Sequence, residues 1–418
     1  MGKLNDILNA IADAIRKKGY NRTDGTPIIK ASAFNNEILL FAEYGFAKNM
    51  VDSDGTGVSQ LREVTIDDKI TSIGEGAFKG LSITKIELHG GVNSIGASAF
   101  SGCENIKSID LKNVKTLGIN CFTQTGITDI VIPASVEKLE GANNSAFTQM
   151  YNVNSITVAE GNSRYYSKDD NGEECNVCVR KEYTSNNTTY KKTLIVGCKN
   201  SVIPEGVEVI FSDAMSSTMC PKTLVLPSTI TTIAGRAFFT SSNLEELEVK
   251  SSINYSTNAF GGVGTVRLIV PSLSVWLNSS FGGSSANPMY SGVSGTTNIS
   301  SSTLYVRMGE EVVLQEDIEI PTDITEIGKY SLIGCSNLKK VKFHGGITKI
   351  GEYSFAYCDN VSEYDFSELD VPPTLVDTTA FTGNHPTNWK ILVKSGTLDS
   401  WKSADNWKTF TNIEESTN

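Results

Sequence analysis

The sequence predicts a solenoid of short parallel strands joined by tight turns, and two columns of apolar residues carry this prediction. One aliphatic column and one phenylalanine column each recur every 22 residues. The aliphatic column comprises Ile73, Ile95, Leu117 and Leu139, and the aromatic column comprises Phe78, Phe100 and Phe122. Two independent columns with one period are the signature of a repeat architecture.

Each repeat contains two kinds of apolar segment. In one, apolar and polar residues alternate, which predicts short strands with one buried face at Ile83–Leu88, Ile106–Leu111 and Leu244–Val249. The other, Ile-Gly-x-x-Ala-Phe, has the spacing of a single helical or 3₁₀ turn, and a following Gly or Asn ends it. One repeat cannot bury its own apolar face, so neighbouring repeats must stack to complete a core.

About nine such units are present, with a degenerate closing unit near residues 376–393. The units begin at Ile70, Val92, Val114, Val136, Val207, Ile230, Ser252, Ile324 and Ile347. The fourth unit carries three extra residues before Phe147. Longer interruptions separate the fourth unit from the fifth and the seventh from the eighth, so we expect insertions there.

The pattern Ser-Ile-Gly-x-x-Ala-Phe-x-Gly-Cys-x-x-Leu-x-x-Ile-x-Ile-Pro resembles the BspA-like leucine-rich repeat family from about residue 66 to the C-terminus. The resemblance implies a leucine-rich-repeat solenoid, a β-rich α/β fold of about 22–23 residues per repeat, preceded by a short N-terminal helical segment. It further implies a hairpin insertion, a second insertion and a C-terminal helix that carries Trp401 and Trp407 and covers the last repeat. Members of the family are often secreted or surface proteins, and their repeats are binding scaffolds for varied partners.

These expectations divide the chain into seven segments. They are residues 1–44, an N-terminal helical attachment or oligomerisation segment; 45–64, a linker; 65–161, repeats; 162–206, a β-hairpin insertion; 207–273, repeats; 274–321, a second insertion; and 322–418, repeats with a C-terminal cap.

The N-terminal segment reads as a short amphipathic helix over Lys3–Tyr20, followed by a second short helix over Ile28–Phe41. The apolar stripe of the first helix comprises Leu4, Ile7, Leu8, Ile11 and Ile15. A helix this short must dock on something to be stable. Two interpretations remain open: the stripe covers the first repeat, or it joins other copies or an anchor protein. The segment resembles the start of some tailed-phage tail and fibre proteins.

Composition narrows the classes of partner. A net charge of −11 disfavours nucleic acid and anionic membranes, and no run of about 18 apolar residues predicts a membrane span. The polar and charged residues of the first 20 do not match a secretory signal, which predicts synthesis in a cytosol. We therefore expect a component of a phage virion, which lysis of the host cell would release to the outside. A homotrimer is one assembly that fits this expectation. The alternative is a bacterial surface or secreted adhesin whose signal peptide was removed.

The sequence carries no recognisable catalytic motif, cofactor motif or strong metal motif. His89 and His344 both begin a His-Gly-Gly segment after a predicted strand, which indicates a role in turns. The acidic run Asp169–Glu174 reads as a solvated loop. We expect a non-enzymatic protein without cofactor or metal, and nothing favours a glycosidase dyad.

The eight cysteines divide into two groups. Cys103, Cys335 and Cys358 share one repeat position and are predicted to be core thiols. For Cys175 and Cys178 the alternatives are structural thiols, a disulfide, or a zinc site with Cys198 and Cys220. Residues three apart on a strand face opposite sides, which disfavours a shared metal.

The partner predicted for the solenoid is a host surface protein or glycan, with other tail proteins bound through the N-terminal helix. Outward residues of the repeat strands are candidate contacts, against the alternative of an ordinary solvated face: Lys85, Glu87, Ser108, Asp110, Asp129, Glu246, Glu248, Lys340, Lys342, Glu363 and Asp365. Aromatic residues of the insertions are further candidates, against the alternative that they close the insertions' own cores: Tyr165, Tyr166, Trp276, Phe281 and Tyr290.

Overall fold

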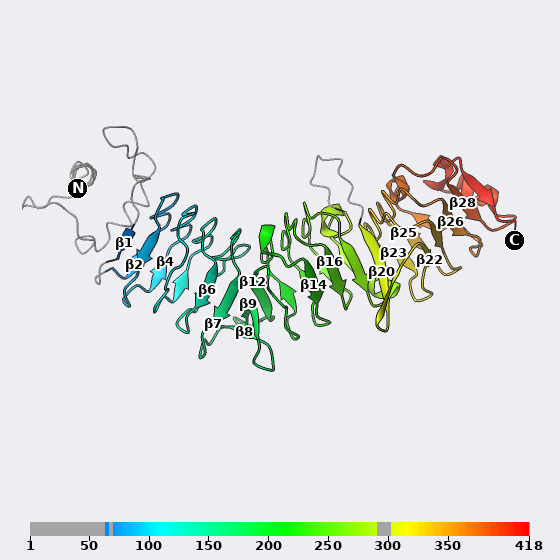
Figure 1. Ribbon diagram of the computed structural model, residues 1–418. Coiled ribbons are helices and arrows are strands. Elements are labelled where there is room, and N and C mark those ends of the chain that lie inside the picture. The colour runs from blue at the N-terminus through cyan, green and yellow to red at the C-terminus, as the bar shows by residue number, and fades with distance from the viewer. Residues whose placement is uncertain (1–62, 67–69, 291–301, 418) are drawn as a thin grey trace, which may run out of the picture. The chain divides into compact units, whose positions relative to one another are not determined.

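A computed structural model describes residues 63–66, 70–290 and 302–417 (Figure 1). The predicted N-terminal helices, with the stripe Leu4 to Ile15, lie outside the described residues. The chain divides into two compact units: the first runs to Lys168 and includes Asn176–Lys181, and the second comprises Asp169–Cys175 and the chain from Glu182 onward. The boundary thus falls inside one strand, β9 (Glu174–Arg180).

The first unit contains parallel strands in two series, one of two-residue strands and one of longer strands. The short series is β2 (Ser72–Ile73), β4 (Ser94–Ile95) and β5 (Thr116–Leu117), hydrogen-bonded in that order. The longer series is β1 (Glu63–Thr65), which pairs with β3 (Lys85–Glu87), and β6 (Asp129–Ile132), which pairs with β7 (Ser155–Val158). β8 (Tyr165–Lys168) lies beside β9 (Glu174–Arg180).

The second unit repeats the same two series. Its short series begins beside the five-residue strand β12 (Thr193–Gly197) and runs β13 (Val209–Ile210), β15 (Thr232–Ile233), β17 (Asn254–Tyr255) and β19 (Ser280–Phe281), and later β23 (Glu326–Ile327), β25 (Lys349–Ile350) and β27 (Thr374–Leu375). One longer sheet runs β14 (Thr223–Leu226), β16 (Glu246–Val249), β18 (Arg267–Val270), β20 (Thr303–Met308) and β21 (Glu311–Leu314). Another runs β22 (Asp317–Glu319), β24 (Lys340–Lys342), β26 (Glu363–Phe366), β28 (Lys390–Val393) and β29 (Ile413–Glu415).

The remaining described elements are short. Antiparallel β10 (Tyr183–Ser185) and β11 (Thr188–Tyr190) form an exposed hairpin. The helices are α4 (Leu273–Leu277) and α5 (Leu398–Ser403), with 3₁₀ turns η3 (Ser217–Met219), η4 (Ser284–Ala286), η5 (Thr378–Phe381) and η6 (Trp407–Thr409). Among the described residues, no helix has the length and apolar character needed to span a lipid bilayer.

The core of the first unit is a ladder of stacked phenylalanines, as the 22-residue column predicts. Successive ring centroids from Phe78 through Phe100 and Phe122 to Phe147 lie 5.3, 5.7 and 5.5 Å apart. Phe100 and Phe122 are fully buried. Each aromatic side chain therefore packs on the equivalent ring of the next repeat, and this stacking is the contact a single repeat cannot make alone.

The Ile-Gly-x-x-Ala-Phe segments are tight turns whose internal bonds join residues three apart, as in the predicted 3₁₀ turn, but most of them do not continue as helix. In the second and third repeats, Ser98 and Asn120 have φ of 54° and 58°, in the left-handed region. Four residues later Gly102 and Gln124 are left-handed as well, with φ of 77° and 55°. A left-handed residue at every fourth position is incompatible with continuous right-handed helix.

These turns bond to the next repeat as well as within themselves. The N–H groups of Ser98, Phe100 and Gly102 donate to carbonyls one repeat further on, at N–O distances of 2.9, 2.8 and 2.8 Å. The accepting carbonyls belong to Ile119, Cys121 and Thr123. The turn side of the solenoid is therefore held by a backbone ladder of its own, which satisfies groups that would otherwise be buried without partners.

One predicted strand does not form. Ile106 and Leu111 are buried as expected, but the segment Ile106–Leu111 has no strand assignment. Its end is occupied by a local turn in which the Lys112 N–H, at a φ of 48°, donates to the Asp110 carboxylate at 3.0 Å. This side-chain bond competes with regular strand pairing.

The last repeat is covered as predicted, but by two elements. Trp401 lies on α5 and Trp407 on η6, both fully buried, with ring centroids 4.7 Å apart. Both rings contact Phe366 of β26, at centroid distances of 5.1 and 5.4 Å. The apolar end of the array is therefore closed by aromatic surface.

The segment expected as the second insertion also carries repeat strands. β19 pairs in parallel with β17, and β20 pairs in parallel with β18. Residues 274–321 thus contribute β19 to the short series and both β20 and β22 to the longer series, and the part that departs from the repeat pattern includes the antiparallel strand β21.

Candidate binding surface

The outward positions of β14, β16, β18 and β20 form an ordered surface in the second unit, called here the strand face. Strand register places them in two rows, because parallel neighbours with equivalent positions share a face. The rows are Thr223, Glu246, Arg267 and Thr303, and Val225, Glu248, Ile269 and Tyr305, of which Ile269 is buried; Arg307 lies two residues beyond Tyr305.

Ion pairs hold the side chains of the strand face in place. Arg267 Nη1 lies 2.7 Å from Glu246 Oε2, and the guanidinium lies over the Tyr305 ring at 4.4 Å from its centroid. Arg307 donates through Nε and Nη2 to the two oxygens of Glu248, at 2.8 and 2.6 Å. A bidentate pair fixes orientation as well as distance. The face therefore presents two arginines and a tyrosine already ordered.

The sheet from β22 to β29 presents a second row in which the charge alternates. Register aligns Asp317, Lys340, Glu363 and Lys390 on successive strands. Both lysines pair with the central acid, at 3.6 Å from Lys340 and 3.5 Å from Lys390. On the neighbouring row, Glu368 lies 2.9 Å from Lys342 and raises its pKa. The charges of these two rows are therefore largely compensated within the chain.

The structure brings the predicted charged residues of the second unit together in pairs. Glu246 and Glu248 share β16, while Lys340 and Lys342 of β24 lie in register with Glu363 and Asp365 of β26. Asp365 also accepts from the N–H of Ser367 at 2.9 Å. These residues lie on the predicted outward faces of their strands.

The predicted residues of the first unit form no such ladder. Lys85 and Glu87 on β3 are exposed and pair with each other at 2.6 Å. Ser108 and Asp110 lie on the irregular segment, where hydrogen bonds from Lys112 lower the pKa of Asp110. Asp129 on β6 accepts from the hydroxyls of Ser155 and Thr128, which lower its pKa. Each acid here is engaged locally.

Three of the five predicted aromatic contacts are core residues, which corrects that expectation. The Trp276 ring is fully buried, and its Nε1 donates to the Ser331 carbonyl at 2.8 Å. Phe281 is buried and stacks on Tyr255 at 5.0 Å. Tyr165 is buried and donates to Glu140 at 2.6 Å. Rings inside a core cannot anchor a partner at the surface.

The other two predicted aromatics are half-buried. Tyr290 stacks on Tyr357 with centroids 5.6 Å apart, and burial together with the nearby Tyr357 and Tyr353 raises its pKa. Tyr166 lies on β8 with its side chain at an intermediate exposure. Neither belongs to the strand face.

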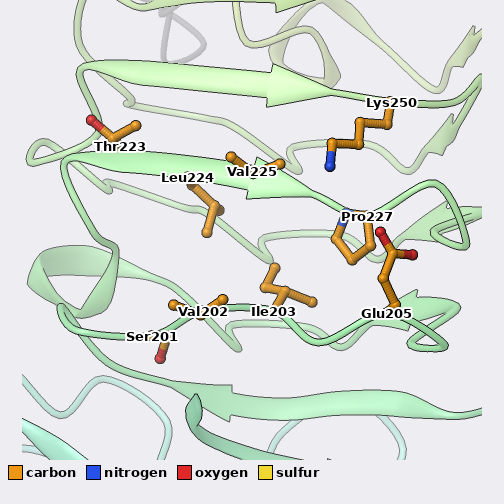
Figure 2. A pocket seen from close by; sticks show the side chains of 9 residues that line it. All are labelled: Ser201, Val202, Ile203, Glu205, Thr223, Leu224, Val225, Pro227 and Lys250. Carbon is orange, nitrogen blue, oxygen red and sulfur yellow. The ribbon is translucent and has the colours of Figure 1, made fainter. Parts of the chain in front are cut away.

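A shallow hollow of about 250 Å³ lies at the end of the strand face (Figure 2). It separates β14 from the segment Ser201–Glu205, and Lys250 and Pro227 also line it. Val202 and Val225 hold equivalent repeat positions on its two sides and are 65% and 38% exposed. β14 is the terminal strand of its sheet, so this hollow marks a break in the ladder.

The histidines form turn contacts, as predicted for two of them. His89 Nδ1 accepts from the Gly91 N–H at 2.9 Å, and its Nε2 lies 2.8 Å from the Ile70 carbonyl. His344 makes the same pair of contacts with Gly346 and Ile324, at 3.0 and 2.9 Å. Since one nitrogen accepts, the other carries the proton and donates to the residue that begins the same repeat.

The thiols are also structural. All eight cysteines are free and buried, including Cys175, Cys178, Cys198 and Cys220. Burial raises the pKa of Cys103 to about 11 and of Cys335 to about 12. In the part of the chain that the structure describes, no group of three or more His, Cys, Asp or Glu side chains is placed to hold a metal ion.

Sequence reasoning missed Arg267, Tyr305 and Arg307. Arg267 occupies the position of Glu246 one repeat later, and alignment of the two repeats was the signal that could have found it. Tyr305 and Arg307 alternate with Leu304 and Val306 in a stretch assigned to the second insertion. The alternation there marked a repeat strand.

Comparison with known proteins places the chain among repeat proteins. No curated protein sequence matched it. Similar solved structures include the pneumococcal vaccine antigen PcpA, at 16% identity over 88% of this chain and 81% of that chain, with a TM-score of 0.45. A leucine-rich repeat protein from Bacteroides ovatus matches at 18% identity over 80% and 84%, with a TM-score of 0.45. A leucine rich cell surface protein from Faecalibacterium prausnitzii matches at 19% identity over 82% and 62%, with a TM-score of 0.32.

These comparisons lend no support to the phage-tail resemblance of the N-terminal segment. The repeat region itself is matched directly. Six copies of the BspA type leucine rich repeat region cover residues 56–154, 185–287 and 310–391. Because these ranges amount to more than half of the sequence, the chain belongs to the BspA-type leucine-rich repeat family.

Proposed function

We propose that this protein is a non-enzymatic adhesin of a bacterial surface or secreted type, which binds a macromolecular partner through the strand face. The observation that supports the proposal is the ordered set of Arg267, Tyr305 and Arg307. Each guanidinium is held by a carboxylate of β16, and Tyr305 is held by Arg267. Arginine and tyrosine are the side chains most enriched among residues that dominate binding energy at protein interfaces.

Prior ordering of these side chains favours binding. A rotamer-rich side chain costs about 0.5–1.5 kcal/mol when an interface immobilises it, and Arg267 and Arg307 are already immobilised by their carboxylate partners. The Arg267–Glu246 pair is partly exposed and should add little to folding stability. The bidentate Arg307–Glu248 pair is more buried, so it contributes to the fold as well as to the orientation of the guanidinium.

The cysteines and histidines, which could carry out chemistry, have structural roles instead, and this supports the same proposal. The thiols are buried, and His89 and His344 serve turns between repeats. The outward strand positions carry the accessible polar groups, spread across neighbouring strands. An extended arrangement of this kind suits a broad macromolecular surface, and membership in the repeat family supports a scaffold role.

Binding to host material tests the proposal. Purified protein would be measured against epithelial cells, extracellular-matrix proteins and an array of glycans. The triple substitution Arg267→Ser, Tyr305→Ser and Arg307→Ser should weaken the observed binding by about tenfold or more. The matched control is Lys340→Ser with Lys342→Ser, on the two compensated rows. It should leave binding near the wild-type level. Circular dichroism would verify that both variants fold.

Two outcomes would contradict the proposal: failure of the wild-type protein to bind any of these surfaces, or hydrolysis of an arrayed glycan. The virion assignment remains a separate prediction, because its support lies in residues 1–44, outside the described residues. Deletion of residues 1–20 tests it. Loss of an oligomeric state would favour attachment through Leu4, Leu8, Ile11 and Ile15, and unchanged assembly would contradict it.

A further inference from the structure

The hairpin formed by β20 and β21 interrupts the parallel strand series with one antiparallel strand. Gly309, at a φ of 66°, lies in the connection between the two strands. β21 is the last strand of its sheet, so among the described residues no strand is hydrogen-bonded to one of its edges. An unpaired edge is a template for an added strand.

The register identifies which backbone groups face that edge. The Gln315 N–H donates to the Leu304 carbonyl at 3.0 Å, which makes these two residues a hydrogen-bonded pair. Such pairs alternate along antiparallel strands, so Val313 bonds to Val306 while Val312 and Leu314 do not bond to β20. The N–H and C=O groups of Val312 and Leu314 therefore point toward the free edge.

The side chains around this edge are apolar and exposed. Met308 is 64% exposed, Val313 39% and Leu314 37%. Natural sheets protect exposed edges with lysine, proline or short strands. Here the edge carries aliphatic side chains on both faces, which favours pairing with another apolar strand.

Acidic residues flank the apolar part at both ends. Glu310 and Glu311 lie at the turn, and Glu316 and Asp317 follow Leu314. Glu316 pairs with Lys339 at 2.8 Å, but among the described residues no salt bridge joins Glu310 or Glu311 to a basic side chain. The hairpin thus has unbalanced negative charge at its turn, and a second copy of the same edge would meet like charge.

A polar hollow of about 410 Å³ lies near the base of the hairpin. It is lined by Glu316, Ser336, Asn337, Lys339, Asn360 and Ser362. Asn337 fixes its wall, since its Oδ1 accepts from the Leu304 N–H at 2.9 Å and its Nδ2 donates to the Gln315 carbonyl. The hairpin is therefore anchored at its base to the following repeat, which holds β21 in place.

We propose that the free edge of β21 binds an extended segment of a partner protein by strand addition. The segment carries alternating apolar residues that cover Met308, Val313 and Leu314, and basic residues that meet Glu310 and Glu311. Main-chain bonds to Val312 and Leu314 supply affinity, and the flanking charges supply selectivity. The proposal rests on the proposed binding function and adds a second contact surface with a defined partner chemistry.

Two labelled peptides of alternating valine and threonine test this proposal, one with paired lysines at both ends and one with paired glutamates. Fluorescence anisotropy on the full chain should show that the lysine peptide binds at least about tenfold tighter. Hydrogen exchange should show added protection at the Val312 and Leu314 amides. The substitutions Glu310→Lys and Glu311→Lys should reverse the preference between the two peptides.

A proline variant separates edge pairing from charge attraction. Leu314→Pro removes an N–H that points away from β20, so the hairpin keeps its internal bonds while the added strand loses one. This variant should weaken binding of the lysine peptide by about tenfold or more. Val371→Lys, at an apolar side chain that is 69% exposed elsewhere, is the matched control and should change nothing.

The proposal is overturned if neither peptide binds, if the two bind the wild-type chain equally, or if protection appears away from β21. It is also overturned if sedimentation shows that the edge joins two copies of this chain and Leu314→Pro makes them monomeric. Failure of the strand-face variants to affect cell binding would count against the proposed function alone, because the peptide assay tests main-chain pairing at the edge of β21 and not the side chains of Arg267, Tyr305 and Arg307.

Discussion

Asp213 and Arg236 hold the same place in consecutive repeats, and their side chains meet with Arg236 Nη2 3.2 Å from Asp213 Oδ1. Both have left-handed backbone, with φ of 56° and 66°. The Asp213 side chain is 4% exposed, whereas that of Arg236 is 42% exposed and its guanidinium lies over the Phe239 ring at 4.1 Å. The acid is therefore buried and the base is largely solvated.

Burial decides how this pair affects stability. Desolvation raises the pKa of Asp213 above its usual range, although the hydrogen bond and charge of Arg236 act in the opposite direction. Oδ1 makes no well-aligned hydrogen bond despite the short distance, so the charge is incompletely compensated. Since the folded-state pKa is raised, the folded protein binds the proton more tightly, and stability from this group falls as pH rises through that pKa.

Asp213→Asn should therefore stabilise the protein near neutral pH, by about 1 kcal/mol, because an uncharged amide costs less to bury. Asparagine suits the left-handed backbone, as Asn120 and Asn258 do at the same repeat position. The gain should shrink as pH falls into the range where Asp213 is protonated in the folded state. Urea unfolding at several pH values measures this gain in the free energy of unfolding. A difference between variant and wild type that does not change with pH would contradict the role given to Asp213 protonation.

The repeat core could be predicted from the sequence because stacking imposes the same requirement on every repeat. Phe78, Phe100 and Phe122 each pack on the next equivalent ring, so the requirement appears as a strict column. The left-handed position in the turns shows no such column of a single residue type. Gly76, Asn120, Asp213, Arg236 and even Tyr330 occupy one left-handed position, so residue type alone does not reveal it.

The candidate site was less predictable for a different reason. Trp276 and Phe281 lie in a polar stretch that reads as a surface loop, and their burial depends on contacts far away in sequence. The bond from Trp276 to the Ser331 carbonyl spans 55 residues. Similarly, Arg307 reaches Glu248 across 59 residues. Such pairings follow from the folding of the second insertion, which repeat alignment does not describe.

Neighbouring turns approach so closely at Gly351 that any side chain there would press against backbone atoms. A Cβ at this position would lie 2.7 Å from the Lys329 nitrogen and 3.0 Å from the Gly328 carbonyl carbon, both backbone atoms. Gly351→Ala should therefore destabilise the protein by about 1–3 kcal/mol through forced separation of two repeats. Gly264→Ala is the control, because a Cβ there meets nothing within 4 Å. Equal unfolding midpoints for the two variants would contradict this reading.

Removal of His344 should cost about 1–2 kcal/mol, since its ring bridges the Gly346 N–H and the Ile324 carbonyl. His344→Asn should recover part of this loss. Its amide oxygen can accept from residue 346 as Asp365 accepts from Ser367, but it cannot also reach Ile324. Denaturant unfolding should therefore rank wild type, then His344→Asn, then His344→Ala. An asparagine variant no better than alanine would show that the turn bond contributes nothing.

Buried thiols should make the folded protein inert toward thiol reagents. All eight cysteines are buried, and burial raises the pKa of Cys103 to about 11 and places that of Cys121 well above its usual range. The reactive thiolate is therefore scarce at neutral pH. Ellman's reagent should detect almost no thiol in the native state and all eight after denaturation. Rapid reaction of one thiol in the native state would identify an accessible cysteine and contradict the assignment.

The two tryptophans of the C-terminal cap should respond differently to replacement by phenylalanine. Trp407 Nε1 donates to the Pro373 carbonyl at 2.7 Å, whereas Trp401 Nε1 is buried with no hydrogen-bond partner among the described residues. Trp407→Phe leaves a buried carbonyl unsatisfied and should cost about 1–3 kcal/mol beyond the loss of ring volume. Trp401→Phe loses similar volume but also removes an unsatisfied N–H, so its cost should be clearly smaller. Unfolding followed by circular dichroism avoids the change in tryptophan fluorescence, and an equal or larger cost for Trp401→Phe would show that packing alone governs the cap.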